Sequence, residues 1–209
     1  AATPPWSLWD GKDYKNMIDQ DEAKFRMIEN HKWKFKAKIF SPLAPLTVKR
    51  TPVLMTRVEY GFLGSYNKYK KSPFETFYMG GDGMSGYSST YATETIGLRG
   101  YENGSIAGNG GYNSYGYAYS RLSMELRYPF LLEPSSTIYG LVFVEAGNAW
   151  RDLKDFNPFQ LKRSAGVGVR IFLPMIGLMG IDWAYGFDRP DGYDQRGGSN
   201  FHFIIGQEF

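Results

Sequence analysis

Residues 32–40 read Lys-Trp-Lys-Phe-Lys-Ala-Lys-Ile-Phe, and this stretch decides the fold class. Four lysines alternate with Trp33, Phe35, Ala37 and Ile39. Because successive side chains of an extended chain point to opposite faces, this period of two places the cations on one face and the apolar groups on the other. The stretch therefore predicts a β-strand with one polar face and one apolar face.

The same alternation returns along most of the chain. In residues 121–130, apolar side chains at the even positions alternate with Arg121, Ser123, Glu125 and Arg127. Residues 137–150 are apolar on both faces until Glu145, and we predict a further strand there. The remaining strands are predicted at residues 54–66, 162–173, 177–188 and 200–209. About seven strands of about ten residues, joined by turns and polar loops, predict an all-β antiparallel fold.

Alternation alone leaves two all-β architectures open. A soluble sandwich or lipocalin-like barrel buries the apolar face, whereas a transmembrane β-barrel turns that face towards lipid. A length of about ten residues suits a tilted membrane-spanning strand, whereas the most apolar stretch, residues 171–181, is too short for a spanning helix. Aromatic residues near the predicted strand ends favour the membrane barrel, since they would form interfacial girdles. These are Trp33, Tyr128, Phe130, Trp150, Phe187 and Phe209.

Composition excludes several function classes. The chain has 209 residues, no cysteine and a net charge of +3, so we expect no disulfide framework and no nucleic-acid partner. No catalytic triad or metal-ligand pattern is visible, and we expect neither enzymatic activity, nor a metal, nor a cofactor. His31 and His202 are the only histidines, and we expect structural or surface roles for both.

Five aspartates are candidate functional groups. We interpret Asp182 and Asp188 as polar lining of the barrel lumen. Asp82, Asp191 and Asp194 lie in glycine-rich stretches and are interpreted as turn residues, with a calcium site as the less favoured alternative.

Residues 72–117 form a long glycine-rich segment between predicted strands. The segment contains Arg99-Gly100-Tyr101. Its aromatic residues favour an ordered loop with a function, because long loops in compact domains are usually either functional or disordered. An arginine can donate two parallel hydrogen bonds to a carboxylate and stays charged in a partly dehydrated lumen, while glycine allows close backbone packing. The other two motifs are the stretch Phe143-Val144-Glu145-Ala146-Gly147-Asn148-Ala149-Trp150 and the alternating C-terminal run that ends on Phe209.

Over about residues 25–209, these three motifs and their order resemble the BamA family of outer-membrane β-barrel assembly proteins. Arg99-Gly100-Tyr101 is similar to the family's motif on a long extracellular loop that enters the lumen. Residues 143–150 are similar to its strand motif, with Glu145 in place of the usual aspartate and with Gly147 in the same motif. The resemblance implies a loop-lock site made of Arg99, Gly100, Tyr101, Glu145 and Gly147.

The resemblance also implies the architecture. The chain is expected to be the C-terminal half of a transmembrane antiparallel barrel of about sixteen strands, with residues 72–117 as the lumen-entering loop. The other strands and the periplasmic POTRA domains would precede Ala1, whose neighbouring residues 1–11 lack the features of a signal peptide. The C-terminal strand, with Phe201, Phe203, Ile205, Gly206 and Phe209, would form one side of a weakly paired seam, where Gln207 interrupts the apolar face.

The function implied is the folding and insertion of β-barrel proteins into the outer membrane of a Gram-negative bacterium. Its partners would be unfolded outer-membrane proteins, outer-membrane lipids and accessory lipoproteins. Two alternatives remain open. One is a polypeptide secretion transporter of the same superfamily, and the other is a passive porin-type barrel, which would lack the Arg99 and Glu145 motifs.

Overall fold

A computed structural model describes residues 1–17, 21–45, 47, 50–83, 94–106, 115–133 and 135–206. Its main element is a seven-stranded antiparallel sheet in the order β1-β2-β5-β6-β7-β8-β9. The strands are β1 (His31–Pro42), β2 (Val53–Gly64), β5 (Ala118–Glu133), β6 (Ser136–Trp150), β7 (Lys162–Leu173), β8 (Gly177–Gly186) and β9 (Gly198–Ile205). Each strand pairs with the next one in this order, so the predicted all-β antiparallel fold is confirmed.

Strand positions agree with the period-two segments, and the ends differ by a few residues. The strand predicted at residues 121–130 is longer in the structure, where β5 and β6 extend together into a hairpin with a register shift between Pro129 and Leu131. β8 ends at Gly186, two residues before the predicted end at Asp188. The last strand was predicted to extend to Phe209. Residues 207–209, and with them Gln207 and Phe209, lie outside the described residues.

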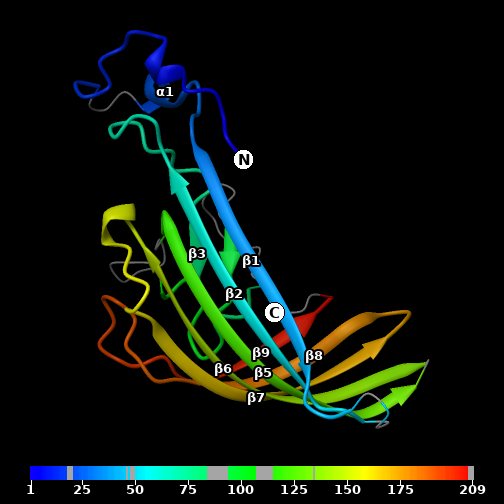
Figure 1. The fold of residues 1–209 in the computed structure, drawn as a ribbon. Helices are drawn as coiled ribbons and strands as arrows, with labels where there is room; N and C mark the ends of the chain where they lie inside the picture. Colours follow the sequence, from blue (N-terminus) through cyan, green and yellow to red (C-terminus); the bar gives the residue numbers. More distant parts are fainter. Residues whose placement is uncertain are drawn as a thin grey trace.

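The sheet is strongly curved (Figure 1), and the long loop packs against its concave face. That loop contains two short parallel strands, β3 (Phe77–Met79) and β4 (Glu94–Ile96). Phe77 and Tyr119 of β5 make an edge-to-face ring contact, with centroids 4.6 Å apart. A small apolar core forms between the loop and the wall, and it includes Leu63, Met79, Leu98 and Ala149. Within the described residues, β1 and β9 are the two ends of the sheet, which does not close on itself.

The two faces of the sheet have opposite character. Apolar side chains on the convex face are exposed; among them are Met124, Leu126, Val142, Val144, Val167, Ile181, Trp183, Phe201 and Phe203. Charged side chains on the concave face are buried; among them are Arg99 of the loop and Arg121, Glu125, Glu145, Arg170 and Asp182 of the wall. This arrangement is the reverse of a soluble barrel and is typical of a transmembrane β-barrel.

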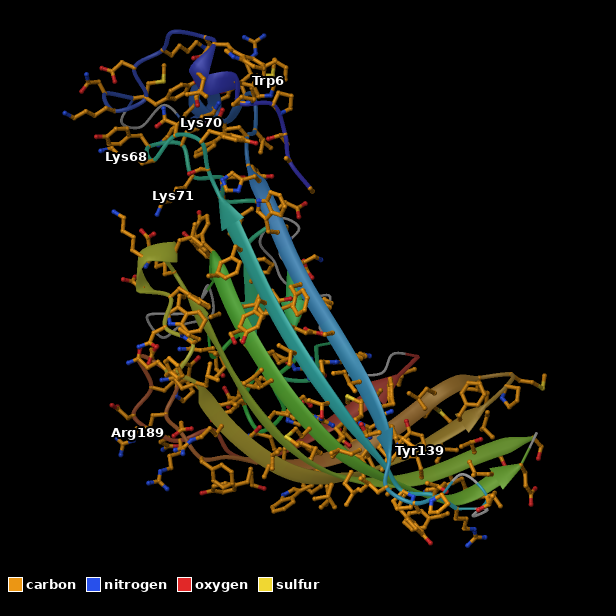
Figure 2. The ribbon with its side chains drawn as sticks, viewed as in Figure 1. Trp6, Lys68, Lys70, Lys71, Tyr139 and Arg189 are labelled. Atoms are coloured by element: carbon orange, nitrogen blue, oxygen red, sulfur yellow. The ribbon has the colours of Figure 1, made fainter. Side chains whose placement is uncertain are left out.

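The N-terminal segment covers one end of β1 and β2. It contains a 3₁₀-helix, η1 (Trp6–Leu8), and a short helix, α1 (Asp21–Phe25). Ala1 exchanges two backbone hydrogen bonds with Lys32, so the segment pairs with the outer edge of β1 at this end. Trp6, Lys68, Lys70 and Lys71 lie at the same end, whereas Tyr139 lies near the far end of the sheet (Figure 2). No helix among the described residues is long and apolar enough to cross a membrane.

The two ends of the sheet also differ in the length of their connections. Short turns join β5 to β6 and β7 to β8 at one end. The long loop, the segment with η2 (Leu153–Asp155) and residues 187–197 lie at the other. In transmembrane barrels the longer loops face the exterior and the short turns face the periplasm. We refer below to the loop end and the turn end.

Candidate functional site

Three consecutive loop residues, Arg99, Gly100 and Tyr101, are attached to the concave face of the sheet, and we call them the loop motif. Arg99 bonds to acidic residues on β5, β6 and β8. Gly100 bonds to His202 on β9, and Tyr101 bonds to the backbone of β7. The loop motif therefore reaches all five strands from β5 to β9.

The Arg99 guanidinium lies at the centre of a group of carboxylates and is fully buried. Its Nη1 donates to Oδ2 of Asp182 at 2.9 Å, and its Nη2 donates to Oε1 of Glu125 at 2.6 Å and to Oε1 of Glu145 at 2.8 Å. One face of the guanidinium stacks on the Phe143 ring, whose centroid lies 3.5 Å from Cζ. A planar cation with several donors suits this position, because a lysine ammonium could neither stack in this way nor present donors from two separate nitrogens.

Each of the three carboxylates is shared with an arginine on the wall of the sheet. Arg127 donates to Glu125, Arg121 donates to Glu145 at 2.8 Å, and Arg170 donates to Asp182 through both Nη atoms. These seven side chains form the charge cluster: Arg99, Arg121, Arg127, Arg170, Glu125, Glu145 and Asp182. The wall arginines therefore hold the carboxylates from the sheet side, while Arg99 binds them from the loop.

Glu145 makes the most bonds to the loop motif. Besides the contact with the Arg99 side chain, its Oε2 accepts the Arg99 backbone N–H at 3.0 Å. Its Oε1 also accepts the Ser123 hydroxyl, which lies directly opposite on β5. The extra methylene of a glutamate thus reaches the loop backbone, and the predicted pairing of Arg99 with Glu145 is observed.

Gly100 adopts a backbone conformation that favours glycine, with φ of +87°. A Cβ built on Gly100 would come within 2.9 Å of both the Gly186 backbone nitrogen and the Ser164 Cβ. Its N–H donates to Nε2 of His202 at 2.9 Å. Both the backbone angle and the close approach explain why this position is a glycine.

Tyr101 attaches the end of the loop motif to the loop end of the sheet. Its hydroxyl donates to the Arg163 carbonyl at 2.6 Å and accepts the Asp188 N–H at 3.3 Å. Burial raises the pKa of the Tyr101 hydroxyl to about 12, so the group remains protonated at neutral pH and keeps its donor. Gly147 lies on β6 beneath the loop, and a Cβ there would come within 2.4 Å of the Met79 methyl group.

Several members of the charge cluster were not singled out from the sequence. The alternation predicts Glu125, Arg121 and Arg127 only as the polar face of a strand, and Arg170 only as a residue within the strand at 162–173. Their common signal is a charged residue on the predicted lumen face, but that signal does not tell which of them the loop contacts. His202 has a specific structural role that its sequence position did not reveal.

The predictions for the other polar residues had mixed outcomes. Asp182 lines the concave face as expected. Asp188 lies two residues beyond the end of β8 and binds Arg163, and this hydrogen bond lowers the pKa of the Asp188 carboxyl. His31 packs over Gly64 and against Tyr66. Asp82, Asp191 and Asp194 lie in turns or bends. Among the described residues, no three His, Asp or Glu side chains are arranged to hold a metal.

The C-terminal strand presents its predicted apolar face. Phe201, Phe203 and Ile205 are exposed on the convex side, and all eight residues of β9 are paired with β8. Gly206 follows with φ of +73°, and its N–H donates to the Leu178 carbonyl. The other edge of β9 has no partner strand among the described residues, and a weakly paired seam at this edge remains a prediction.

Comparisons with known proteins agree with this geometry. The structure is similar to the crystal structure of BamA from Haemophilus ducreyi lacking POTRA domains 1–3, with a TM-score of 0.56 and 21% sequence identity. The match covers 84% of this chain and 34% of that protein, so the chain spans about a third of its relative. At this identity the likeness shows the fold, which is that of part of the BamA barrel. No curated protein matches the chain. The model of the Omp85 superfamily domain matches residues 25–209, and the chain therefore belongs to the Omp85 superfamily.

Proposed function

We propose that this chain is the C-terminal part of a membrane barrel that folds and inserts other β-barrel proteins into the outer membrane of a Gram-negative bacterium. Further strands that close the barrel, and POTRA domains, would belong to the same protein outside this chain. The observation that carries the proposal is the attachment of the loop motif to five consecutive strands.

This attachment supports an assembly function over a passive pore. A porin needs an open lumen, whereas here the loop packs against the concave face through buried apolar and charged contacts. The same contacts stiffen β5 to β9. A stiff wall can present one edge strand to a partner without changing its own register.

The edge of β9 is the best candidate for that purpose. At the loop end, the N-terminal segment already pairs with the outer edge of β1, whereas β9 has only β8 beside it in the described part of the chain. An unfolded client strand could add to β9 by β-augmentation, with backbone hydrogen bonds that require no particular sequence. Phe201, Phe203 and Ile205 would face the lipid next to the client. Lipids and accessory lipoproteins are further proposed partners, and no covalent chemistry is needed.

A disulfide that locks the seam tests the proposal. In the full-length protein, a cysteine replacing Phe203 would be paired with one on the first strand of the barrel. The chain has no cysteine of its own, which keeps the bond specific. The oxidised protein should fold but should fail to insert a client barrel into liposomes, and reduction should restore insertion.

The other functions give different results in the same experiment. The unpaired Phe203→Cys variant is the control and should insert clients at the unmodified rate. Full insertion by the oxidised protein would exclude the seam. Translocation of a soluble polypeptide through the barrel would identify a secretion transporter, and ion conductance without either activity would identify a porin.

A further inference from the structure

The two residues at the start of the loop motif bind two residues that face each other across the last strand pair. Arg99 donates to Asp182 on β8, and the next residue, Gly100, donates to His202 on β9. Asp182 and His202 are directly opposite in the β8–β9 register. The loop therefore bridges the two strands at a single level of the sheet.

His202 is the contact that brings the last strand into this arrangement. Arg99 reaches β5, β6 and β8, and Tyr101 reaches β7 and the segment after β8. The bond from Gly100 to His202 adds β9 to the strands that the loop motif binds in the described part of the chain. The imidazole is buried, with 6% of its residue surface exposed.

The chemistry of this bond is specific. An N–H can donate only to an unprotonated ring nitrogen, so Nε2 carries no proton and the proton of the neutral ring lies on Nδ1. Packing fixes the geometry, because Gly100 lies against Gly186 at the end of β8 and Gly197 just before β9. A buried N–H that loses its acceptor is costly, so the backbone of the loop motif is held at β9 as long as His202 accepts.

We propose that His202 is a positioning residue that couples the loop motif to the last strand, so that β9 and the backbone of Gly100 move as one unit. A strand that displaced β9 from its place beside β8 would then also release Gly100, while Arg99 stayed bound to β5 and β6. The coupling itself does not depend on the proposed function, and only its use by a client strand rests on it.

Amide hydrogen exchange in the full-length protein tests the coupling. His202→Leu removes the acceptor at similar volume, and Gly100 should then exchange about tenfold faster, the factor that corresponds to one buried hydrogen bond. His202→Gln restores an acceptor oxygen of similar reach and should bring exchange back towards the native rate. Equal exchange in the native and His202→Leu proteins, or no rescue by His202→Gln, would overturn the proposal.

Further measurements distinguish a failure of the coupling from a failure to fold and from a failure of the proposed function. His31→Leu alters the other histidine, which packs over Gly64 on β2, and should leave Gly100 exchange unchanged. Heat-modifiable mobility on gels shows whether each variant is folded. If His202→Leu does not fold, Gly100 exchange is compared between His202→Gln and the native protein in the presence of a client.

A client crosslinked to β9 should accelerate Gly100 exchange in the native protein. A crosslinked client without this effect would overturn the coupling, whereas a client that never reaches β9 would overturn the proposed function alone.

Discussion

Arg99 donates a 2.9 Å hydrogen bond to Asp182, a residue 83 positions later in the chain. Asp182 is held from its other side by Arg170, at 2.5 Å and 2.7 Å. The acid thus connects the loop to β7 and β8 at once. It is one of three carboxylates with the same double attachment, and Arg99 is the partner that all three share.

Replacing Arg99 should loosen the loop. Arg99→Ala leaves three buried carboxylates with less positive charge around them, and the loss of one partner from a buried ionic group costs about 3–5 kcal/mol. Arg99→Lys keeps the charge but loses the stacking on Phe143 and the donation from two separate nitrogens, so a smaller loss is expected. Protease cleavage within residues 72–117 measures the effect. Arg189→Ala, on an exposed side chain labelled in Figure 2, is the control and should not change cleavage.

Shortening the Glu145 side chain should lower the free energy of unfolding less than removing its charge. Glu145→Gln leaves Arg99 and Arg121 without a shared anion, and we expect a loss of about 3–5 kcal/mol in the free energy of unfolding. Glu145→Asp keeps the charge but shortens the side chain, so one of the two bonds to Arg99 is lost, at about 1–2 kcal/mol. Denaturant unfolding in detergent measures both. Glu133→Gln, at the exposed end of β5, should leave the midpoint unchanged, and equal losses at Glu145 would contradict this order.

The Tyr101 hydroxyl should stabilise the loop end of the sheet. Tyr101→Phe leaves the ring in place but removes the bonds to the Arg163 carbonyl and the Asp188 N–H. We expect a loss of about 1–2 kcal/mol, together with faster amide exchange at Asp188. Tyr69→Phe, on an exposed ring, is the matched control. If Asp188 exchange is the same in both variants, the hydroxyl has no such role.

The two faces of β8 should differ in their access to lipid. Single cysteines at Trp183 and Tyr185 should react with a lipid-soluble probe in membranes, whereas cysteines at Asp182 and Ala184 should not. The first two side chains are exposed on the convex face, and the latter two are fully buried on the concave face. Mass spectrometry of the labelled protein gives the yield at each site. Similar labelling at positions 182 and 183 would contradict a lipid-facing convex surface.

Period two in the sequence predicted the strands because it is a local property of an extended chain. The alternation in residues 177–188 appears in β8 as one buried and one exposed face, whereas β1 is exposed on both faces along most of its length. The pattern does not determine where a strand ends. Asp188 continued the pattern in the sequence, but its carboxylate binds Arg163 beyond the end of β8. The short strands β3 and β4 carried too few residues for any period to be visible.

The sequence by itself determined the all-β class and the alternation of most strands, because these are local properties of the chain, while the pairing of Arg99 with Glu145 was an expectation from the family resemblance. The tertiary structure alone decided which face is buried, and which acids meet Arg99. Glu125 and Asp182 reach the same guanidinium only because the sheet curves and the loop folds back across it. The contact between Gly100 and His202 spans 102 positions and depends on the register of β9, which no local pattern encodes.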